Sequence, residues 1–196
     1  MMNETYVILD ELPDVFLDEI INIGYEIGFE PSKIYIDNKD ILNNIDNNMR
    51  SSEQAWLPQN NYHHLWNRIT DYFLFANRVN FNFDISHGIY EVQILKYNHT
   101  TSDHFDWHHD VIYESQTSHR KISMTIQLSD PNTYEGGDIL FGNHVESFSD
   151  LDPVLQQAKK RGSVVMFNSY MRHCVTPVTK GVRYSLVAWA SGPPFR

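Results

Sequence analysis

The stretch "DHFDWHHD", residues 103–110, places three histidines and three aspartates within eight positions, beside one phenylalanine and one tryptophan. It contains two overlapping His-x-Asp pairs, His104 with Asp106 and His108 with Asp110. Residues i and i+2 of a β-strand point to the same face, so either pair would present two metal ligands side by side. In a strand all four side chains would share one face, and local geometry alone leaves both pairs open as candidates.

Length and composition predict one globular domain with a sizeable core. The chain has 196 residues, of which 41% are hydrophobic and 13% aromatic. The net charge of −10 disfavours nucleic acid as a partner, because such binding depends on Lys and Arg neutralising phosphates. Cys174 is the only cysteine, which excludes an internal disulfide and a cysteine-based zinc site.

The sequence predicts a cytoplasmic protein that is not bound to a membrane. The first residues, "MMNETYVILDELPD", contain no basic region followed by an apolar run, so they do not resemble a secretory signal. No uncharged apolar stretch approaches the ~20 residues that a membrane span needs.

Two amphipathic helices are predicted in the first part of the chain. Apolar residues recur at helical spacing over residues 14–28 and again over residues 60–79. Asp14 follows a proline and is a candidate N-cap of the first helix. The Asn-rich segment between the helices, residues 37–56, lacks periodicity and is predicted to form a long surface loop.

From about residue 88 the sequence pattern is that of an all-β structure. Short runs rich in β-branched and aromatic residues, separated by glycine-containing turns, predict strands at residues 89–97, 121–129, 138–141, 163–167 and 183–190. Such spacing is typical of a sandwich or a jelly roll, with the two helices packed outside. We therefore expect a single domain over residues 1–196, with residues 1–87 as helical support and loop and residues 88–196 as the β-core.

A third candidate ligand lies far along the chain from the His-x-Asp pairs. His173 follows a predicted strand, and two histidines with one carboxylate hold Fe(II) while leaving coordination positions open. Arg183, ten residues later, opens a strand and offers two parallel hydrogen bonds to a carboxylate, and Ser185 shares its face. The remaining histidines are interpreted as surface or structural residues, except His109 within the motif: His63, His64, His87, His99, His119 and His144.

These motifs, in this order, resemble the iron(II)- and 2-oxoglutarate-dependent dioxygenases, specifically the prolyl 4-hydroxylase-like group. The matching segments are "RSSEQAWL", "LKYN", "FDWHHD", "KISMTIQLSDPNTYEGGDILF", "GSVVMFNSYMRHCVTPVTKGVRYSLVAW" and "GPPF". The resemblance implies a mainly β fold, a distorted double-stranded β-helix, which is a jelly-roll variant flanked by N-terminal α-helices. One departure is Thr100, where the family commonly has glycine.

The resemblance also chooses between the two His-x-Asp pairs. The family places an aromatic residue directly before the ligand histidine, and Trp107 precedes His108. It also places a tyrosine that binds the co-substrate about ten residues before that histidine, and Tyr97 lies at about this distance from His108. It therefore implies a catalytic metal site of three residues: His108, Asp110 and His173. For binding of 2-oxoglutarate it implies a further set: Arg183, Tyr97, Ser185 and Thr125.

The activity implied by the resemblance is hydroxylation with Fe(II), 2-oxoglutarate and O2, with ascorbate as a candidate reductant. The expected substrate is a prolyl residue of a peptide or protein, and the alternative is a free amino acid or another small molecule. Residues 37–55 and 111–119 are candidates for loops that cover the substrate. A nucleic-acid-modifying oxygenase and a non-catalytic metal-binding barrel are the rival classes.

Overall fold

The computed structural model describes residues 5–9, 12–32, 48–111, 119–142 and 158–194. It contains two α-helices, α1 (Asp14–Ile27) and α2 (His63–Ala76), and α2 continues into a π-helical turn, η1 (Asn77–Phe81). The described part of the second half of the chain also contains two short 3-10 turns, η2 (His99–Thr101) and η4 (Pro131–Thr133). Within the described part of the chain, no helix is both long enough and apolar enough to cross a membrane.

The strands form two main antiparallel sheets and one small pair. The seven-stranded sheet has the order β1 (Thr5–Leu9), β10 (Ser163–Asn168), β7 (Arg120–Gln127), β13 (Val182–Ser191), β5 (Gly88–Asn98), β4 (Glu53–Trp56) and β2 (Glu30–Pro31). The four-stranded sheet has the order β3 (Arg50–Ser51), β6 (His104–His108), β11 (His173–Val175) and β9 (Ile139–Phe141). A separate pair joins β12 (Val178–Lys180) to β8 (Glu135–Gly136).

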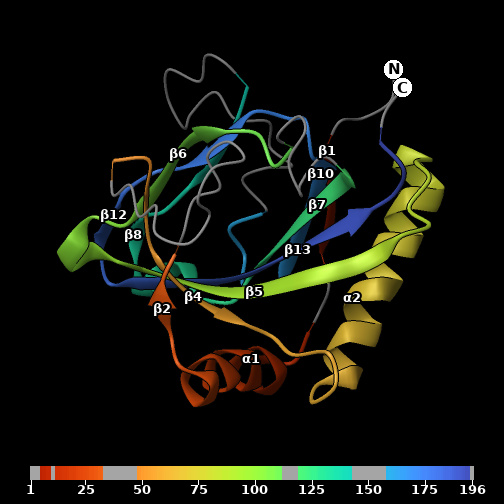
Figure 1. The fold of residues 1–196 in the computed structure, drawn as a ribbon. Coiled ribbons are helices and arrows are strands. Elements are labelled where there is room, and N and C mark those ends of the chain that lie inside the picture. Colours follow the sequence, from red (N-terminus) through yellow and green to blue (C-terminus); the bar gives the residue numbers. More distant parts are fainter. Residues whose placement is uncertain (1–4, 10–11, 33–47, 112–118, 143–157, 195–196) are drawn as a thin grey trace.

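The two faces of the seven-stranded sheet have different roles. In Figure 1, α1 and α2 lie along one side of this sheet, while β6 lies on the other side. Alternate residues of β5 and β13 join the hydrophobic core shared with the helices: Val92, Ile94, Leu186, Ala188 and Ala190. The residues between them line a cavity on the opposite face: Gln93, Leu95, Tyr97, Arg183, Ser185, Val187 and Trp189. The period of two in each strand thus separates a packing face from a cavity-lining face.

The structure confirms the two predicted helices and the five predicted strands to within a few residues at their ends. It differs at Asp14, which is the first residue of α1 rather than its cap. Pro13 occupies the cap position without a side-chain hydrogen bond. The Asp14 carboxylate instead accepts a hydrogen bond from Arg161 at 2.9 Å.

The first 87 residues contribute strands that the sequence did not predict. β1 extends the seven-stranded sheet beyond β10. β3 belongs to the four-stranded sheet, where it pairs with β6, and β4 belongs to the seven-stranded sheet, where it pairs with β5. The predicted surface loop at residues 37–56 is therefore wrong at its end, where Gln54 and Ala55 of β4 are buried beside β5. The rest of that segment, residues 37–47, and most of the second candidate covering loop, residues 112–118, lie outside the described residues.

Truncation of a core residue on β5 is expected to test this packing. Ile94 is fully buried between the sheet and the helices, so Ile94→Ala should lower the free energy of unfolding by about 2–5 kcal/mol. Tyr90 lies on the same strand but is 63% exposed, so Tyr90→Ala should change it by no more than about 0.5 kcal/mol. Denaturant titrations of both variants measure the difference, and equal losses would contradict this packing.

Candidate active site

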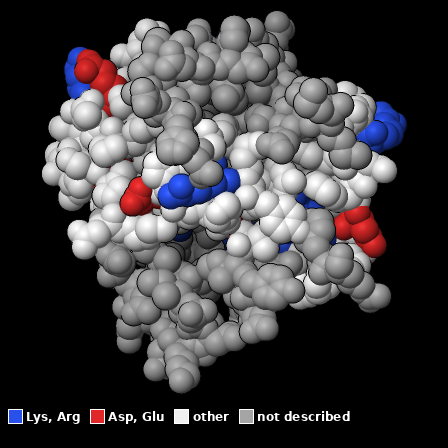
Figure 2. Space-filling view, turned by 90° about the horizontal axis from the view of Figure 1, so that it is seen from above, with Lys and Arg blue, Asp and Glu red and all other residues white. Residues whose placement is uncertain are grey.

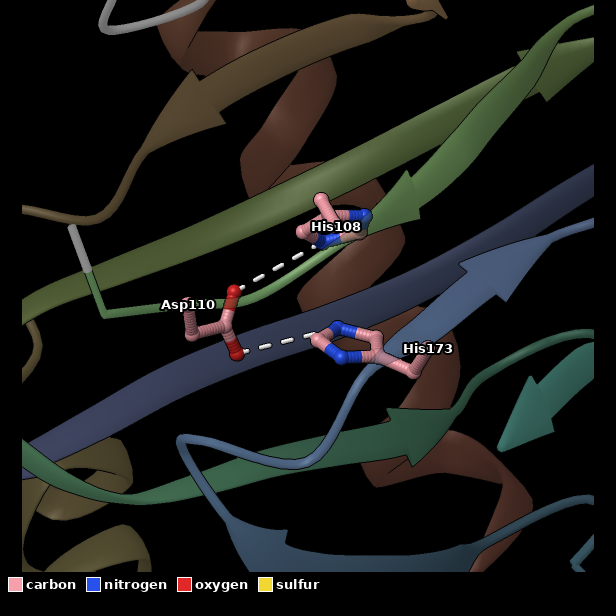
Figure 3. A group of neighbouring side chains, drawn as sticks. All are labelled: His108, Asp110 and His173. Carbon is pink, nitrogen blue, oxygen red and sulfur yellow. Dashed lines mark ion pairs between the residues drawn. The ribbon is translucent and has the colours of Figure 1, made fainter. Parts of the chain in front are cut away.

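The side chains of His108 and Asp110 point toward that of His173, which lies more than sixty residues later in the sequence, beside the paired strands β6 and β11 (Figure 3). His108 ends β6, Asp110 follows two residues later, and His173 begins β11, directly paired with His108. One ligand atom from each residue lies within 4.8 Å of the other two. The Nε2 atom of each histidine is 3.7 Å from a carboxylate oxygen of Asp110. The cluster thus offers two imidazole nitrogens and one carboxylate around a single point.

Backbone carbonyls determine which ring nitrogen of each histidine faces the cluster. Nδ1 of His108 lies 2.7 Å from the carbonyl oxygen of Asp106, and Nδ1 of His173 lies 2.9 Å from that of Met171. A carbonyl oxygen only accepts, so each Nδ1 carries the proton and each Nε2 presents a lone pair. Burial lowers the pKa of His173 to about 4, which keeps its ring neutral at neutral pH.

Asp110 is buried and ionised. Burial by itself would raise the pKa of its carboxyl group, but the positive charge of the His173 ring when it is protonated, with contributions from His108 and Arg120, outweighs that effect and holds the pKa well below its usual range. One carboxylate oxygen accepts a hydrogen bond from the Ser123 hydroxyl, and the Asp110 amide donates to the Ser169 carbonyl at 3.1 Å. A carboxylate facing two imidazole lone pairs places three electron-rich atoms together, an arrangement that a divalent cation would stabilise.

The other His-x-Asp pair lies outside this cluster. Both ring nitrogens of His104 contact backbone carbonyls, Nδ1 with Ser102 at 3.0 Å and Nε2 with Asn48 at 3.1 Å. The carboxylate of Asp106 accepts from the backbone amide of Trp107 at 2.7 Å. Both side chains therefore stabilise the local backbone of β6, and neither has an atom directed at the three-residue cluster.

All of the site residues predicted from the sequence line one cavity between the two sheets: Tyr97, His108, Asp110, Thr125, His173, Arg183 and Ser185. Tyr97 on β5 is the direct cross-strand partner of Arg183 on β13. Burial raises the pKa of the Tyr97 phenol, so it remains a hydrogen-bond donor at neutral pH. The structure therefore brings together side chains from five strands, β5, β6, β7, β11 and β13, and from the turn after β6.

Arg183 is buried, and its side-chain hydrogen bonds go to neutral groups. Only 4% of its surface is exposed, its Nε donates to Oε1 of Gln127 at 3.2 Å, and its Nη1 donates to the Ser185 hydroxyl at 3.4 Å. The guanidinium carbon lies 5.5 Å from the centre of the Tyr97 ring. Among the described residues Arg183 forms no ion pair, so a carboxylate from a ligand would be its natural partner.

Two polar residues that line the cavity, Gln93 and Arg50, were missed from the sequence. Gln93 is 4% exposed, and its Oε1 is buried with no hydrogen-bond partner among the described residues. It lies on the same face of β5 as Tyr97, so the period of two counted back from that tyrosine could have identified it. Arg50 lies over the ring of Phe105, which in turn stacks on the ring of His108. Its place in the cavity depends on the unpredicted strand β3.

Comparison with known proteins assigns the chain to a family. The family model described as "2OG-Fe(II) oxygenase superfamily" matches residues 92–191, and the chain belongs to that superfamily. A PKHD-type hydroxylase of Synechococcus sp. (strain CC9605) is 36% identical over 93 residues, which are 46% of this chain and 37% of that protein. The PKHD-type hydroxylase YbiX of Escherichia coli (strain K12 / DH10B) is 36% identical over 72 residues, 35% of this chain and 27% of that protein. The matched part of the chain thus spans 37% of the first relative and 27% of the second.

Solved structures confirm the predicted fold. A Pseudomonas putida prolyl-4-hydroxylase superposes with a TM-score of 0.69 at 16% identity, covering 96% of this chain and 93% of that one. A Trichoplax adhaerens prolyl hydroxylase, in complex with a hypoxia inducible factor peptide fragment, gives a TM-score of 0.68 at 16% identity, covering 96% and 84%. At these identities the similarity establishes the fold, a double-stranded β-helix with helices on the outer face of its larger sheet.

Proposed function

We propose that this chain is a single-domain Fe(II)- and 2-oxoglutarate-dependent hydroxylase that acts on prolyl residues of a peptide or protein. One observation carries the proposal: a His–Asp–His cluster suited to a divalent metal lines the same cavity as a buried arginine that has no ion-pair partner among the residues that the structure describes. The first group of residues suits the metal-chelating end of 2-oxoglutarate, and the second suits its distal carboxylate.

His108, Asp110 and His173 would hold the iron in this proposal. Bound Fe(II) would couple oxidative decarboxylation of 2-oxoglutarate by O2, which yields succinate and CO2, to insertion of the second oxygen atom into a substrate C–H bond. The Nδ1–H bonds of both histidines to backbone carbonyls fix the orientation of the rings, and the Ser123 hydroxyl does the same for the carboxylate.

The remaining cavity residues would bind and orient the co-substrate. Arg183 is placed to receive the 5-carboxylate, with further hydrogen bonds from the protonated Tyr97 phenol and the hydroxyls of Ser185 and Thr125. Apolar side chains, Leu95 and Val175 among them, complete the cavity wall and exclude water from the reacting groups. Ascorbate is a candidate reductant that would keep the iron in the ferrous state.

Structural neighbours of the chain support the choice of a prolyl substrate. Two structural neighbours are prolyl hydroxylases, and one of them was solved with a peptide fragment. A nucleic-acid substrate is disfavoured by the net charge of −10. In Figure 2, the charged side chains among the described residues of the face above β6 are scattered, with no continuous basic band. The main alternative is therefore a free amino acid or another small molecule.

A turnover assay with a panel of substrates tests this proposal. Succinate release and product mass would be followed with prolyl peptides and with free amino acids, in the presence and absence of Fe(II), with His173→Ala as the metal-site control. We expect iron-dependent succinate release and a peptide product that gains one oxygen atom. Efficient hydroxylation of free proline, with no reaction of the peptides, would favour the small-molecule alternative. Absence of any iron-dependent succinate release would favour a non-catalytic metal-binding barrel.

A further inference from the structure

The "EGG" segment, residues 135–137, comprises β8 and the following glycine; it has no role in the proposed chemistry, yet Gly137 lies directly against Arg183. Gly136 and Gly137 both have positive φ angles, +75° and +62°, which glycine adopts without strain. A Cβ atom on Gly136 would lie 2.1 Å from the carbonyl oxygen of Pro177. A Cβ atom on Gly137 would lie 2.8 Å from Cδ of Arg183 and 2.9 Å from Cγ2 of Val178. The absence of a side chain at Gly137 therefore provides the space that the stem of Arg183 occupies.

A buried carboxamide holds the other end of the same side chain. The Nε2 group of Gln127 donates to the Tyr134 hydroxyl at 2.9 Å and to the carbonyl oxygen of Ser129 at 3.1 Å. Because a backbone carbonyl only accepts, the NH2 group must face that side, and Oε1 is left to accept from Nε of Arg183. Gln127 and Tyr134 are 4% and 8% exposed, so water competes little for these bonds.

The guanidinium needs such support because the carboxylate of Asp138, which could attract it in place of a ligand carboxylate, lies nearby. Arg183 lines the metal cavity and also a smaller cavity behind it, which contains Asp138 and Lys159. The carboxylate of Asp138 pairs with Lys159 and also interacts electrostatically with Arg183. A loosely held Arg183 side chain would have a carboxylate to move toward, away from the cavity that contains His108, Asp110 and His173.

We propose that Gln127, Tyr134 and Gly137 are positioning residues for co-substrate binding. By holding the Arg183 guanidinium against the metal cavity, they set the preference of the site for a 2-oxo acid that carries a distal carboxylate. This inference rests on the proposed role of Arg183 as the anchor for 2-oxoglutarate. None of the three residues needs to touch the co-substrate, because each acts through the position of the arginine.

The test compares two ligands that share the metal-chelating end. 2-Oxoglutarate has a distal carboxylate, whereas oxalate chelates a metal through its two carboxylates and has no group left to reach Arg183. Dissociation constants for both would be measured by calorimetry on protein loaded with Mn(II), which supports no turnover here. The variants are Gly137→Ala, Gln127→Glu, which places a carboxylate beside the guanidinium, and Tyr134→Phe. Gly28→Ala is the matched control, since Gly28 also has a positive φ of 94° but an added Cβ meets nothing within 4 Å.

We expect Gly137→Ala and Gln127→Glu to weaken 2-oxoglutarate binding about tenfold or more, as the loss of a charge-assisted hydrogen bond would, and to leave oxalate binding within about twofold. Tyr134→Phe should give a smaller loss of the same selectivity, and Gly28→Ala none. Thermal unfolding identifies any variant that does not fold, and the conclusion then depends on the remaining two.

Equal weakening of both ligands, or unchanged 2-oxoglutarate binding in the folded variants, would overturn the inference. Arg183→Ala separates this failure from that of the proposed function. If Arg183→Ala weakens 2-oxoglutarate binding and the three positioning variants do not, only the inference fails. If Arg183→Ala itself has no effect, the assignment of the anchor fails with it.

Discussion

Replacement of His108 by alanine is expected to abolish iron-dependent turnover of 2-oxoglutarate, whereas His104→Ala should keep most of it. The imidazole Nε2 of His108 is one of three ligand atoms that lie within 4.8 Å of one another, and its loss leaves an incomplete set. Both ring nitrogens of His104 contact backbone carbonyls, so its loss affects the local backbone of β6 and removes no ligand.

The comparison between the two histidines is decisive because they lie four residues apart on one strand. Succinate release and Fe(II) affinity under anaerobic conditions would be measured for both variants, with their thermal stability as a check on folding. If His104→Ala is inactive and His108→Ala retains activity, the wrong His-x-Asp pair has been assigned to the metal.

Replacement of Arg183 by alanine should sharply raise the 2-oxoglutarate concentration needed for turnover and leave iron affinity nearly unchanged. Removing one member of a buried, hydrogen-bonded charge pair costs about 2–5 kcal/mol, which is a large loss of co-substrate affinity. Arg183→Lys keeps the positive charge but loses the planar fork of donors, so its effect should be intermediate.

A second arginine supplies the control for this prediction. Arg161 pairs with Asp14 and Asp18 and does not line the cavity, so Arg161→Ala should not alter the 2-oxoglutarate requirement. The KM for 2-oxoglutarate and the dissociation constant of the metal would be measured for each variant. An unchanged KM in Arg183→Ala would contradict the assignment of this residue as the carboxylate anchor.

The long strands and both helices could be predicted from the sequence because each presents several turns or alternations of a regular pattern. β5 and β13 alternate between core and cavity over ten residues or more, and the helices repeat their apolar positions over fourteen. β2 and β3 have two residues each, too few to show any period, and are strands only because they pair with β4 and β6. Their formation depends on tertiary contacts that are absent from local sequence.

Some residues of the candidate site could likewise be predicted from the sequence, and others could not. Residues that match a motif, such as His173 and Arg183, could be located by their order and spacing alone. The role of Gln127 could not, because its contact with Arg183 joins residues 56 positions apart and depends on the register between β7 and β13. The choice of His108 over His104, by contrast, could be made from the sequence through the family resemblance, because Trp107 precedes His108 and Tyr97 lies upstream at the expected spacing.

If Arg183 binds the distal carboxylate of 2-oxoglutarate as proposed, its burial couples co-substrate binding to the stability of the folded chain. Burying a guanidinium that has no ion-pair partner among the described residues costs desolvation free energy. The free energy of unfolding of the ligand-free protein is therefore lower than it would be with a carboxylate bound to Arg183. A ligand that binds only the folded state restores stability by mass action, by about 2.7 kcal/mol at a hundred times its dissociation constant. The fraction of unfolded chains exposed to proteases should therefore fall as 2-oxoglutarate rises, so that metabolite supply would affect the abundance of the protein as well as its rate of turnover.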